Sequence, residues 1–172
     1  MHFYSGFSLK DDISFFKEYI KVSDFNVTGF SYGAIKALLH VRDTKQRVDT
    51  LQLFSPAFFQ TKPEKFRRLQ MMAYKKDTQK YLDNFIKTSF YPYPIQETLH
   101  VKTTSQELHE LLYYEWSMKS LKEIVNRGVE IEVYLGEKDA IIDADGAKKF
   151  FLEFATTYYI KGANHFLMTS PT

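Results

Sequence analysis

The segment Gly29–Gly33, with the sequence GFSYG, constrains the fold of this chain more than any other segment. It directly follows the strand-like residues Phe25–Thr28 and precedes Ala34–Val41, where Ala, Ile and Leu favour a helix. Between a strand and a helix, a Gly-x-Ser-x-Gly sequence turns the chain so sharply that the central serine is strained and its hydroxyl is exposed. Glycines flank the serine because the neighbouring strand and helix leave no room for a Cβ atom. The segment predicts a nucleophilic Ser31, and a Gly-Ser turn without catalytic meaning is the alternative.

Strand-like and helix-like patterns alternate along the rest of the chain. Runs typical of strands cover His2–Tyr4, Phe25–Thr28, Val48–Phe54, Glu130–Leu135 and Thr157–Ile160. Helical patterns cover Asp11–Tyr19, Ala34–Val41, Ser117–Gly128 and about Asp145–Phe154. Strands that alternate with helices imply a parallel, doubly wound sheet. We therefore predict an α/β fold, in a single domain over residues 1–172.

Residues 58–116 differ in character from the rest of the chain. They are rich in Lys, Arg, Gln, Tyr and Phe, and their helical periodicity is interrupted at Pro92 and Pro94. Thr104 and Glu107 have the spacing of a capping box, which predicts the start of the last helix in this segment. We expect the segment to form a helical insertion, the one candidate for a second lobe.

A serine hydroxyl is a weak nucleophile at neutral pH and needs an imidazole to accept its proton. Of the five histidines, His165 is the best placed, because it follows a strand in a Gly-Ala-Asn loop near the end of the sequence. The others lie in the opening strand, on the helix after the serine, or in the insertion, where surface or satisfied histidines are expected: His2, His40, His100 and His109.

The carboxylate that orients such a histidine is expected after the end of a strand and before the histidine. Asp139 meets both conditions, since it follows the strand Glu130–Leu135 closely. Asp143 is the alternative. Asp145 is expected instead to begin the next helix, where the helix dipole favours a carboxylate.

Acyl transfer through a serine also requires N–H groups that hold the oxyanion of the tetrahedral intermediate. One is expected from the backbone of Tyr32, the residue after Ser31. The second is expected from the loop Ser5–Ser8 after the first strand. We assign it to the N–H of Phe7, because Gly6 lets this loop approach closely. A simple strand-to-helix turn is the alternative.

Composition excludes several other classes of protein. A net charge of +2 gives no nucleic-acid signature. The absence of Cys excludes disulfides, thiolate catalysis and Cys-ligated zinc, and it fits a reducing compartment. No signal-peptide pattern is visible, and no apolar run approaches the ~20 residues that span a bilayer. We therefore expect a soluble, cytoplasmic protein. The aromatic content of 17% suits either a core or an apolar tunnel.

Taken together, these residues resemble the α/β-hydrolase superfamily over essentially the whole chain, including its order of serine, acid and histidine. Within it, the pattern is similar to the pimeloyl-[acyl-carrier protein] methyl ester esterases of biotin synthesis, in their short, BioV-like form. Phe7 stands at the tryptophan position of their Gly-Trp-Gly-type oxyanion loop. Ser31 occupies the GxSxG position, Asp139 the G-x-x-D position, and His165 that of the late histidine.

The resemblance implies an α/β-hydrolase fold with a shortened, mostly parallel sheet and a helical cap inserted after the strand that follows the nucleophile helix. It implies a carboxylic ester hydrolase that acts on pimeloyl-acyl-carrier protein methyl ester. The acyl-carrier protein is the implied partner, with no nucleic acid, membrane, metal or organic cofactor. Two departures stand out: the first two strands of the full sheet have no counterpart, and only seven residues follow His165. Less covered sheet edges are therefore expected.

The insertion is expected to form a cap over Ser31. Its candidate carrier-binding residues are Arg67, Arg68, Lys75 and Lys76. Its candidate substrate-binding residues are the aromatic residues Phe90, Tyr91 and Tyr93. On one unbroken helix the four basic residues would face outward together and attract an acidic carrier protein, and a merely solvated face is the alternative. The aromatic residues would line the acyl channel or, alternatively, pack the cap against the core.

Two other functions are compatible with these residues. The first is a different hydrolase on the same fold, such as an acyl-carrier thioesterase or a small-ester hydrolase. The second is a non-catalytic binding protein with a hydrolase fold, against which the complete set of Ser, Asp and His argues.

Overall fold

A computed structural model describes residues 1–170 and contains a five-stranded parallel sheet in the order β1-β3-β4-β6-β7. The strands are β1 (His2–Tyr4), β3 (Asn26–Phe30), β4 (Thr50–Phe54), β6 (Glu130–Gly136) and β7 (Thr156–Ile160). Phe30 pairs with Phe54, and Phe54 pairs with Tyr134, so the carboxyl ends of the three central strands lie together at one edge. All residues of β3 and β4 are buried, as expected for central strands of a parallel sheet.

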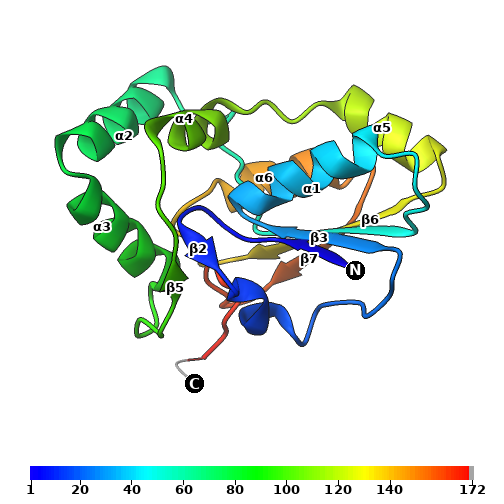
Figure 1. The fold of residues 1–172 in the computed structure, drawn as a ribbon, viewed down its shortest axis with the longest axis horizontal. Helices are drawn as coiled ribbons and strands as arrows, with labels where there is room; N and C mark the ends of the chain where they lie inside the picture. Colours follow the sequence, from blue (N-terminus) through cyan, green and yellow to red (C-terminus); the bar gives the residue numbers. More distant parts are fainter. Residues whose placement is uncertain (171–172) are drawn as a thin grey trace.

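Three helices cover one face of this sheet (Figure 1): α1 (Tyr32–Asp43), α5 (Met118–Asn126) and α6 (Ala144–Phe151). The sequence explains where two of them begin. The Ser117 hydroxyl accepts a hydrogen bond from the N–H of Ser120, and the Asp143 carboxylate accepts one from the N–H of Gly146. The N-cap of α6 is thus Asp143, and Asp145 lies in the first turn, at the start of the helix as expected.

The opposite face of the sheet has no α-helix among the described residues, so the sheet is not doubly wound. A single short 3₁₀ helix, η1 (Asp12–Phe16), replaces the longer helix predicted over Asp11–Tyr19. Aromatic side chains fill the space instead. The Phe16 ring stacks on Phe54 with centroids 4.8 Å apart and lies 4.7 Å from that of Phe30. The high aromatic content therefore supplies a layer that a helix would otherwise supply.

Because Phe16 is central to this layer, we expect Phe16→Ala to lower the free energy of unfolding by about 3–5 kcal/mol, the cost of a large cavity in a core. Its side chain is fully buried, whereas that of Phe25 is 39% exposed. Phe25→Ala is the matched control and should cost roughly 1 kcal/mol or less. Chemical denaturation of the two variants measures both values, and equal costs would contradict the assigned role of Phe16.

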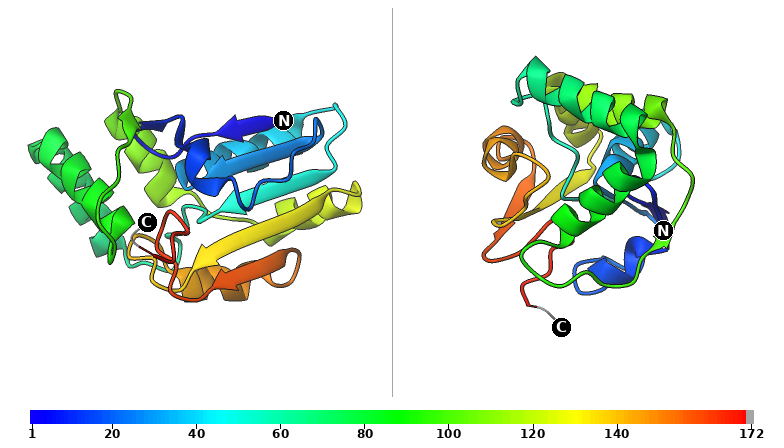
Figure 2. Two further views of the ribbon diagram at one scale, coloured as in Figure 1. Left: turned by 90° about the horizontal axis from the view of Figure 1, so that it is seen from below. Right: turned by 90° about the vertical axis from the view of Figure 1, so that its left-hand side faces the viewer.

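The insertion forms a cap at the carboxyl end of the sheet, toward which the strand arrows point (Figure 2). It consists of α2 (Glu64–Lys76), α3 (Thr78–Phe90) and α4 (Ser105–Tyr113). The predicted capping box at the start of α4 is confirmed, with Thr104 and Glu107 as its two members.

Residues 91–104, here called the strap, join α3 to α4. Within the strap, β5 (Leu99–His100) pairs antiparallel with β2 (Leu9–Lys10). No helix in the described part of the chain is long and apolar enough to cross a membrane.

Candidate active site

Ser31 lies in the turn between β3 and α1, with φ 53° and ψ −114°. The backbone of a residue other than glycine is strained at this φ, as the sequence pattern predicts. The two glycines of the motif are explained by close backbone approach. A Cβ atom on Gly29 would overlap the carbonyl oxygen of Gly33, and a Cβ atom on Gly33 would overlap that of Tyr4. This second contact brings the end of β1 against the start of α1.

The three residues expected to act together are in hydrogen-bond contact. The Ser31 Oγ lies 3.0 Å from Nε2 of His165, and Nδ1 of the same ring lies 2.6 Å from Oδ2 of Asp139. With the ring proton on Nδ1, His165 donates to the carboxylate and can accept the proton of Ser31. Ser31 and His165 are both buried, so these hydrogen bonds face little competition from water.

Asp139, and not Asp143, is the carboxylate in contact with His165. The N–H groups of Ile141 and Ile142 donate to Oδ1 of Asp139 at 2.8 and 3.1 Å, which leaves Oδ2 directed at the histidine. Asp143 instead caps α6 and accepts a hydrogen bond from the Thr61 hydroxyl at 2.7 Å. This bond to Thr61 lowers the pKa of Asp143. The two hydrogen bonds give the Asp143 carboxylate a structural role that needs no catalytic one.

Asn164 is a further residue of the site that the sequence interpretation did not single out. Its Oδ1 accepts hydrogen bonds from the N–H groups of Phe166 and Met168, both at 3.0 Å, and so shapes the loop that carries His165. Its Nδ2 donates to the carbonyl of Phe90 at 2.8 Å, at the end of cap helix α3. The sequence offered one sign of this role, because Asn164 directly precedes His165.

The loop expected to hold the oxyanion also has a buried partner. The N–H of Gly6 donates to Oδ2 of Asp12 at 2.8 Å, and burial raises the pKa of this carboxyl group. The N–H groups of Phe7 and Tyr32 have no acceptor among residues 1–170, so both are free to bind an oxyanion. Asp12 was not predicted, because its position suggested only a helix N-terminus.

The aromatic residues at the end of α3 pack the cap against the core. Phe90 is fully buried and stacks on Phe166 with centroids 4.2 Å apart. The Tyr93 hydroxyl donates to the carbonyl of Gly162 at 2.8 Å, beside the histidine loop. Tyr91 is 63% exposed. Phe90 and Tyr93 thus make the packing contacts of the alternative interpretation, and the lining of an acyl channel by Phe90 and Tyr91 stays a prediction.

The four basic residues of α2 do not all face solvent. The guanidinium of Arg67 lies over the ring of Tyr113 at 5.0 Å and pairs with Glu64 at 3.5 Å, so Arg67 is turned toward α4. Arg68, Lys75 and Lys76 are exposed, as expected. The prediction that all four point outward together is wrong for Arg67. Among the described residues, no group of three or more His, Asp or Glu side chains is arranged to hold a metal ion.

The parallel sheet, the serine turn and the late histidine loop define the α/β-hydrolase fold. No protein-family model matches the chain, and no curated protein is significantly similar to it in sequence. Solved structures do resemble it. MenH from S. aureus is 14% identical, with a TM-score of 0.60 over 95% of this chain and 85% of that one. BioG from Haemophilus influenzae is 10% identical, with a TM-score of 0.59 over 96% of this chain and 87% of that one.

A carboxylesterase also shares the fold. Naproxen esterase (carboxylesterase NP) from Bacillus subtilis is 18% identical, with a TM-score of 0.54 over 83% of this chain. The chain spans only 53% of the length of that esterase, and 58% of the length of an esterase from Exiguobacterium antarcticum. At these identities the similarity shows the fold alone.

Proposed function

We propose that this chain is a serine carboxylesterase. The observation that carries the proposal is the hydrogen-bonded series from Ser31 through His165 to the buried carboxylate of Asp139. Such a series activates a serine hydroxyl for attack on an ester carbonyl.

The proposed mechanism has two stages. His165 accepts the proton of Ser31 as its Oγ attacks the ester carbonyl, and Asp139 stabilises the imidazolium that forms. The N–H groups of Phe7 and Tyr32 donate to the oxyanion. His165 then gives its proton to the departing alcohol. Water, deprotonated by the same histidine, attacks the acyl-enzyme and releases the acid and Ser31.

The proposed substrate is the methyl ester of a pimeloyl chain on acyl-carrier protein, an ester hydrolysed in biotin synthesis. The resemblance of the sequence pattern to the esterases of this step supports the proposal. Growth of a host that lacks its own esterase, without added biotin and with this chain expressed, is the direct test. Failure of the active, folded protein to restore growth would contradict the assigned substrate.

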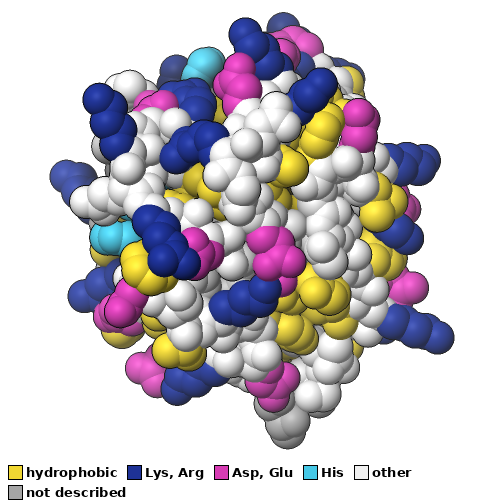
Figure 3. Space-filling view, turned by 90° about the vertical axis from the view of Figure 1, so that its right-hand side faces the viewer, with side chains coloured by type: hydrophobic (Ala, Val, Ile, Leu, Met, Phe, Trp, Pro, Cys, Tyr) yellow, Lys and Arg dark blue, Asp and Glu magenta, His cyan; other side chains and the backbone are white. Residues whose placement is uncertain are grey.

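An exposed basic surface on the cap supports the proposal that the partner is an acidic protein. Arg68, Lys75 and Lys76 on α2, here called the basic face, have no ion-pair partner within residues 1–170. Leu69 and Met72 lie among them on the same helix and are 49% and 60% exposed. A different arrangement is found at the end of the molecule away from the cap, where Lys and Arg alternate with Asp and Glu (Figure 3). Exposed apolar side chains within a basic surface suit a protein partner of negative charge.

Replacing the three residues of the basic face by Glu should raise KM for a carrier-bound ester by at least about tenfold, because electrostatic attraction speeds the encounter of oppositely charged partners. Turnover of a small free ester should be nearly unchanged. High salt should lower kcat/KM of the wild type on the carrier-bound ester alone.

The matched control reverses the same number of charges at Lys45, Lys119 and Lys122, which are exposed and lie on or beside helices away from the cap. An equal effect of the two triple variants, or an equal salt response of both substrates, would show that the basic face is only solvated.

The same assays separate the alternative functions. A thioesterase would turn over the carrier thioester faster than the carrier-bound methyl ester, and a small-ester hydrolase would prefer the free ester. A non-catalytic binding protein would not react with a fluorophosphonate probe, which labels an activated serine.

A further inference from the structure

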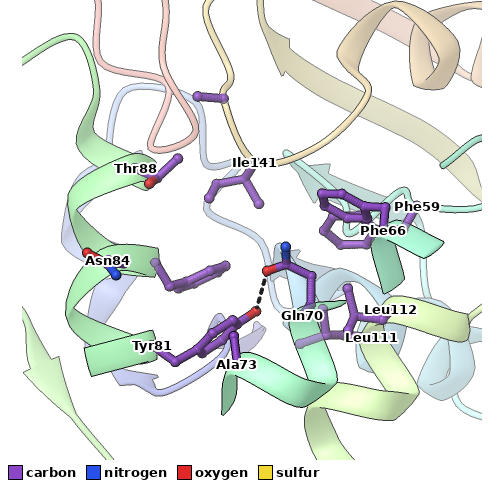
Figure 4. A pocket seen from close by; sticks show the side chains of 12 residues that line it. Phe59, Phe66, Gln70, Ala73, Tyr81, Asn84, Thr88, Leu111, Leu112 and Ile141 are labelled. Carbon is purple, nitrogen blue, oxygen red and sulfur yellow. Dashed lines mark hydrogen bonds between the residues drawn. The ribbon is translucent and has the colours of Figure 1, made fainter. Parts of the chain in front are cut away.

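A cavity of about 310 Å³ lies within the cap, at the small end of the range for small-molecule sites. Side chains from α2, α3 and α4 line it, together with residues that follow Asp139 (Figure 4). Its walls are largely apolar: Phe59, Phe66, Ala73, Phe85, Leu111, Leu112, Ala140 and Ile141.

The cavity adjoins both loops of the candidate active site. Ile141, which lines it, donates its N–H to Asp139. Phe85, which also lines it, contacts the ring of Phe7 edge-on with centroids 5.8 Å apart. A chain on an acyl group at Ser31 that extends past these two loops would therefore meet an apolar space.

The lining contains no Lys, Arg, His, Asp or Glu. Its polar members are Gln70, Tyr81, Asn84 and Thr88. A free carboxylate at the distal end of an acyl chain would therefore find no cationic partner in this lining. The cavity therefore favours a neutral chain.

Among these polar residues, Gln70 directs its amide group into the space. Its nitrogen is turned toward Ile141 and away from Tyr81 (Figure 4). The Tyr81 hydroxyl donates to Oε1 of Gln70 at 3.1 Å. Burial raises the pKa of Tyr81, so its hydroxyl keeps the proton that it donates to the Gln70 oxygen. The Nε2 of Gln70 then has no acceptor among residues 1–170.

We propose that Gln70 determines substrate specificity, by donating an Nε2 hydrogen bond to a neutral acceptor on the acyl chain at a distance from the scissile ester. A second carbonyl, as in an ester, a thioester or an amide, has the required chemistry. The inference rests on the proposed esterase function and deepens it, since it defines the class of acyl chain. An amide donor in a largely apolar wall discriminates between chains, because only a chain with an acceptor can pair with it.

The test compares three series of methyl esters of equal chain length: alkanoate methyl esters, dimethyl dicarboxylates and monomethyl dicarboxylates. For the wild type we expect kcat/KM on the best dimethyl ester to exceed that on the matching alkanoate ester by about tenfold, as one neutral hydrogen bond allows. The monomethyl ester, with its free carboxylate, should be the poorest substrate. Gln70→Leu should abolish the preference for the diester and leave the alkanoate ester nearly unchanged.

Two further variants keep the test decisive. Gln70→Glu retains the shape of the side chain but removes the N–H donor, and it should also lose the preference for the diester. Asn84→Leu, at an exposed amide on the cavity rim that points away from the space, should keep it. Thermal melting shows whether each variant is folded.

Several outcomes would overturn the proposal. If Gln70→Leu lowers kcat/KM equally on the diester and the alkanoate ester, Gln70 has a structural role. If it lowers kcat/KM on neither ester, the acyl chain does not reach Gln70. Efficient turnover of the monomethyl ester would place the chain elsewhere, such as the 760 Å³ hollow beside Lys102. If the wild type neither hydrolyses any ester nor reacts with a fluorophosphonate, the esterase function itself fails. Equal turnover of alkanoate and diester by an active enzyme removes only the role of Gln70.

Discussion

Ser31→Ala should fold normally and lose essentially all esterase turnover, by on the order of 10⁶ in kcat, as found when the nucleophile of a catalytic triad is removed. The Oγ of Ser31 is the atom that lies 3.0 Å from Nε2 of His165, and alanine leaves no group there to attack a carbonyl. The backbone should tolerate the change, because alanine needs no more room than serine in the turn. Steady-state turnover of a short ester and the melting temperature measure the two halves of this expectation.

Ser55 provides a matched control for Ser31. It is also a fully buried serine that follows a strand, has a positive φ of 40°, and lacks a partner for its Oγ among the described residues. Ser55→Ala should retain activity within a few-fold and keep fluorophosphonate labelling. Retention of more than a few per cent of activity by Ser31→Ala would refute the proposed mechanism.

The serine turn and its partners were predictable because their signals are local. The GFSYG segment needs glycine on both sides of Ser31, and the structure shows backbone carbonyl groups where each Cβ would lie. His165 and Asp139 were found from their positions after strands, since carboxyl ends of parallel strands meet at one edge of a sheet. The contact between the three side chains follows from that topology.

The first connection of the sheet could not be predicted from periodicity. The helical pattern over Asp11–Tyr19 produces only the short η1. A side chain from β4 holds the residues after it: the N–H of Lys21 donates to Oε1 of Gln52 at 2.9 Å, and Nε2 of Gln52 donates to the carbonyl of Tyr19. Such tertiary contacts override a weak helical preference, and no local pattern reports them.

The error in the cap has a similar origin. Spacing along α2 shows which residues share a face, but not what lies opposite that face. Arg67 is turned inward because Tyr113, from another helix, offers an aromatic surface, and Glu64 lies within ion-pair distance. Phe90 is likewise buried by Phe166, from the far end of the sequence. Both contacts require knowledge of how the cap packs.

Asp139→Asn should lower kcat by about 10⁴, because an asparagine in this position favours the wrong tautomer of the histidine. The carboxylate Oδ2 lies 2.6 Å from Nδ1 of His165, and its other oxygen is held by the N–H groups of Ile141 and Ile142. An amide that keeps its oxygen on those two donors would present its NH₂ group to Nδ1. Nδ1 would then have to accept a hydrogen bond, Nε2 would carry the proton, and the ring could not deprotonate Ser31.

Asp143→Asn is the matched control, four residues along the same segment. Asparagine caps helices about as well as aspartate, so the bond to the N–H of Gly146 should survive, and the bond with Thr61 is remote from the histidine. This variant should keep kcat within a few-fold and show at most a small change in melting temperature. If Asp143→Asn instead loses activity while Asp139→Asn retains it, the acid of the site has been wrongly assigned. If both retain activity, His165 is not oriented by a carboxylate, and the series of hydrogen bonds from Ser31 is not a catalytic triad.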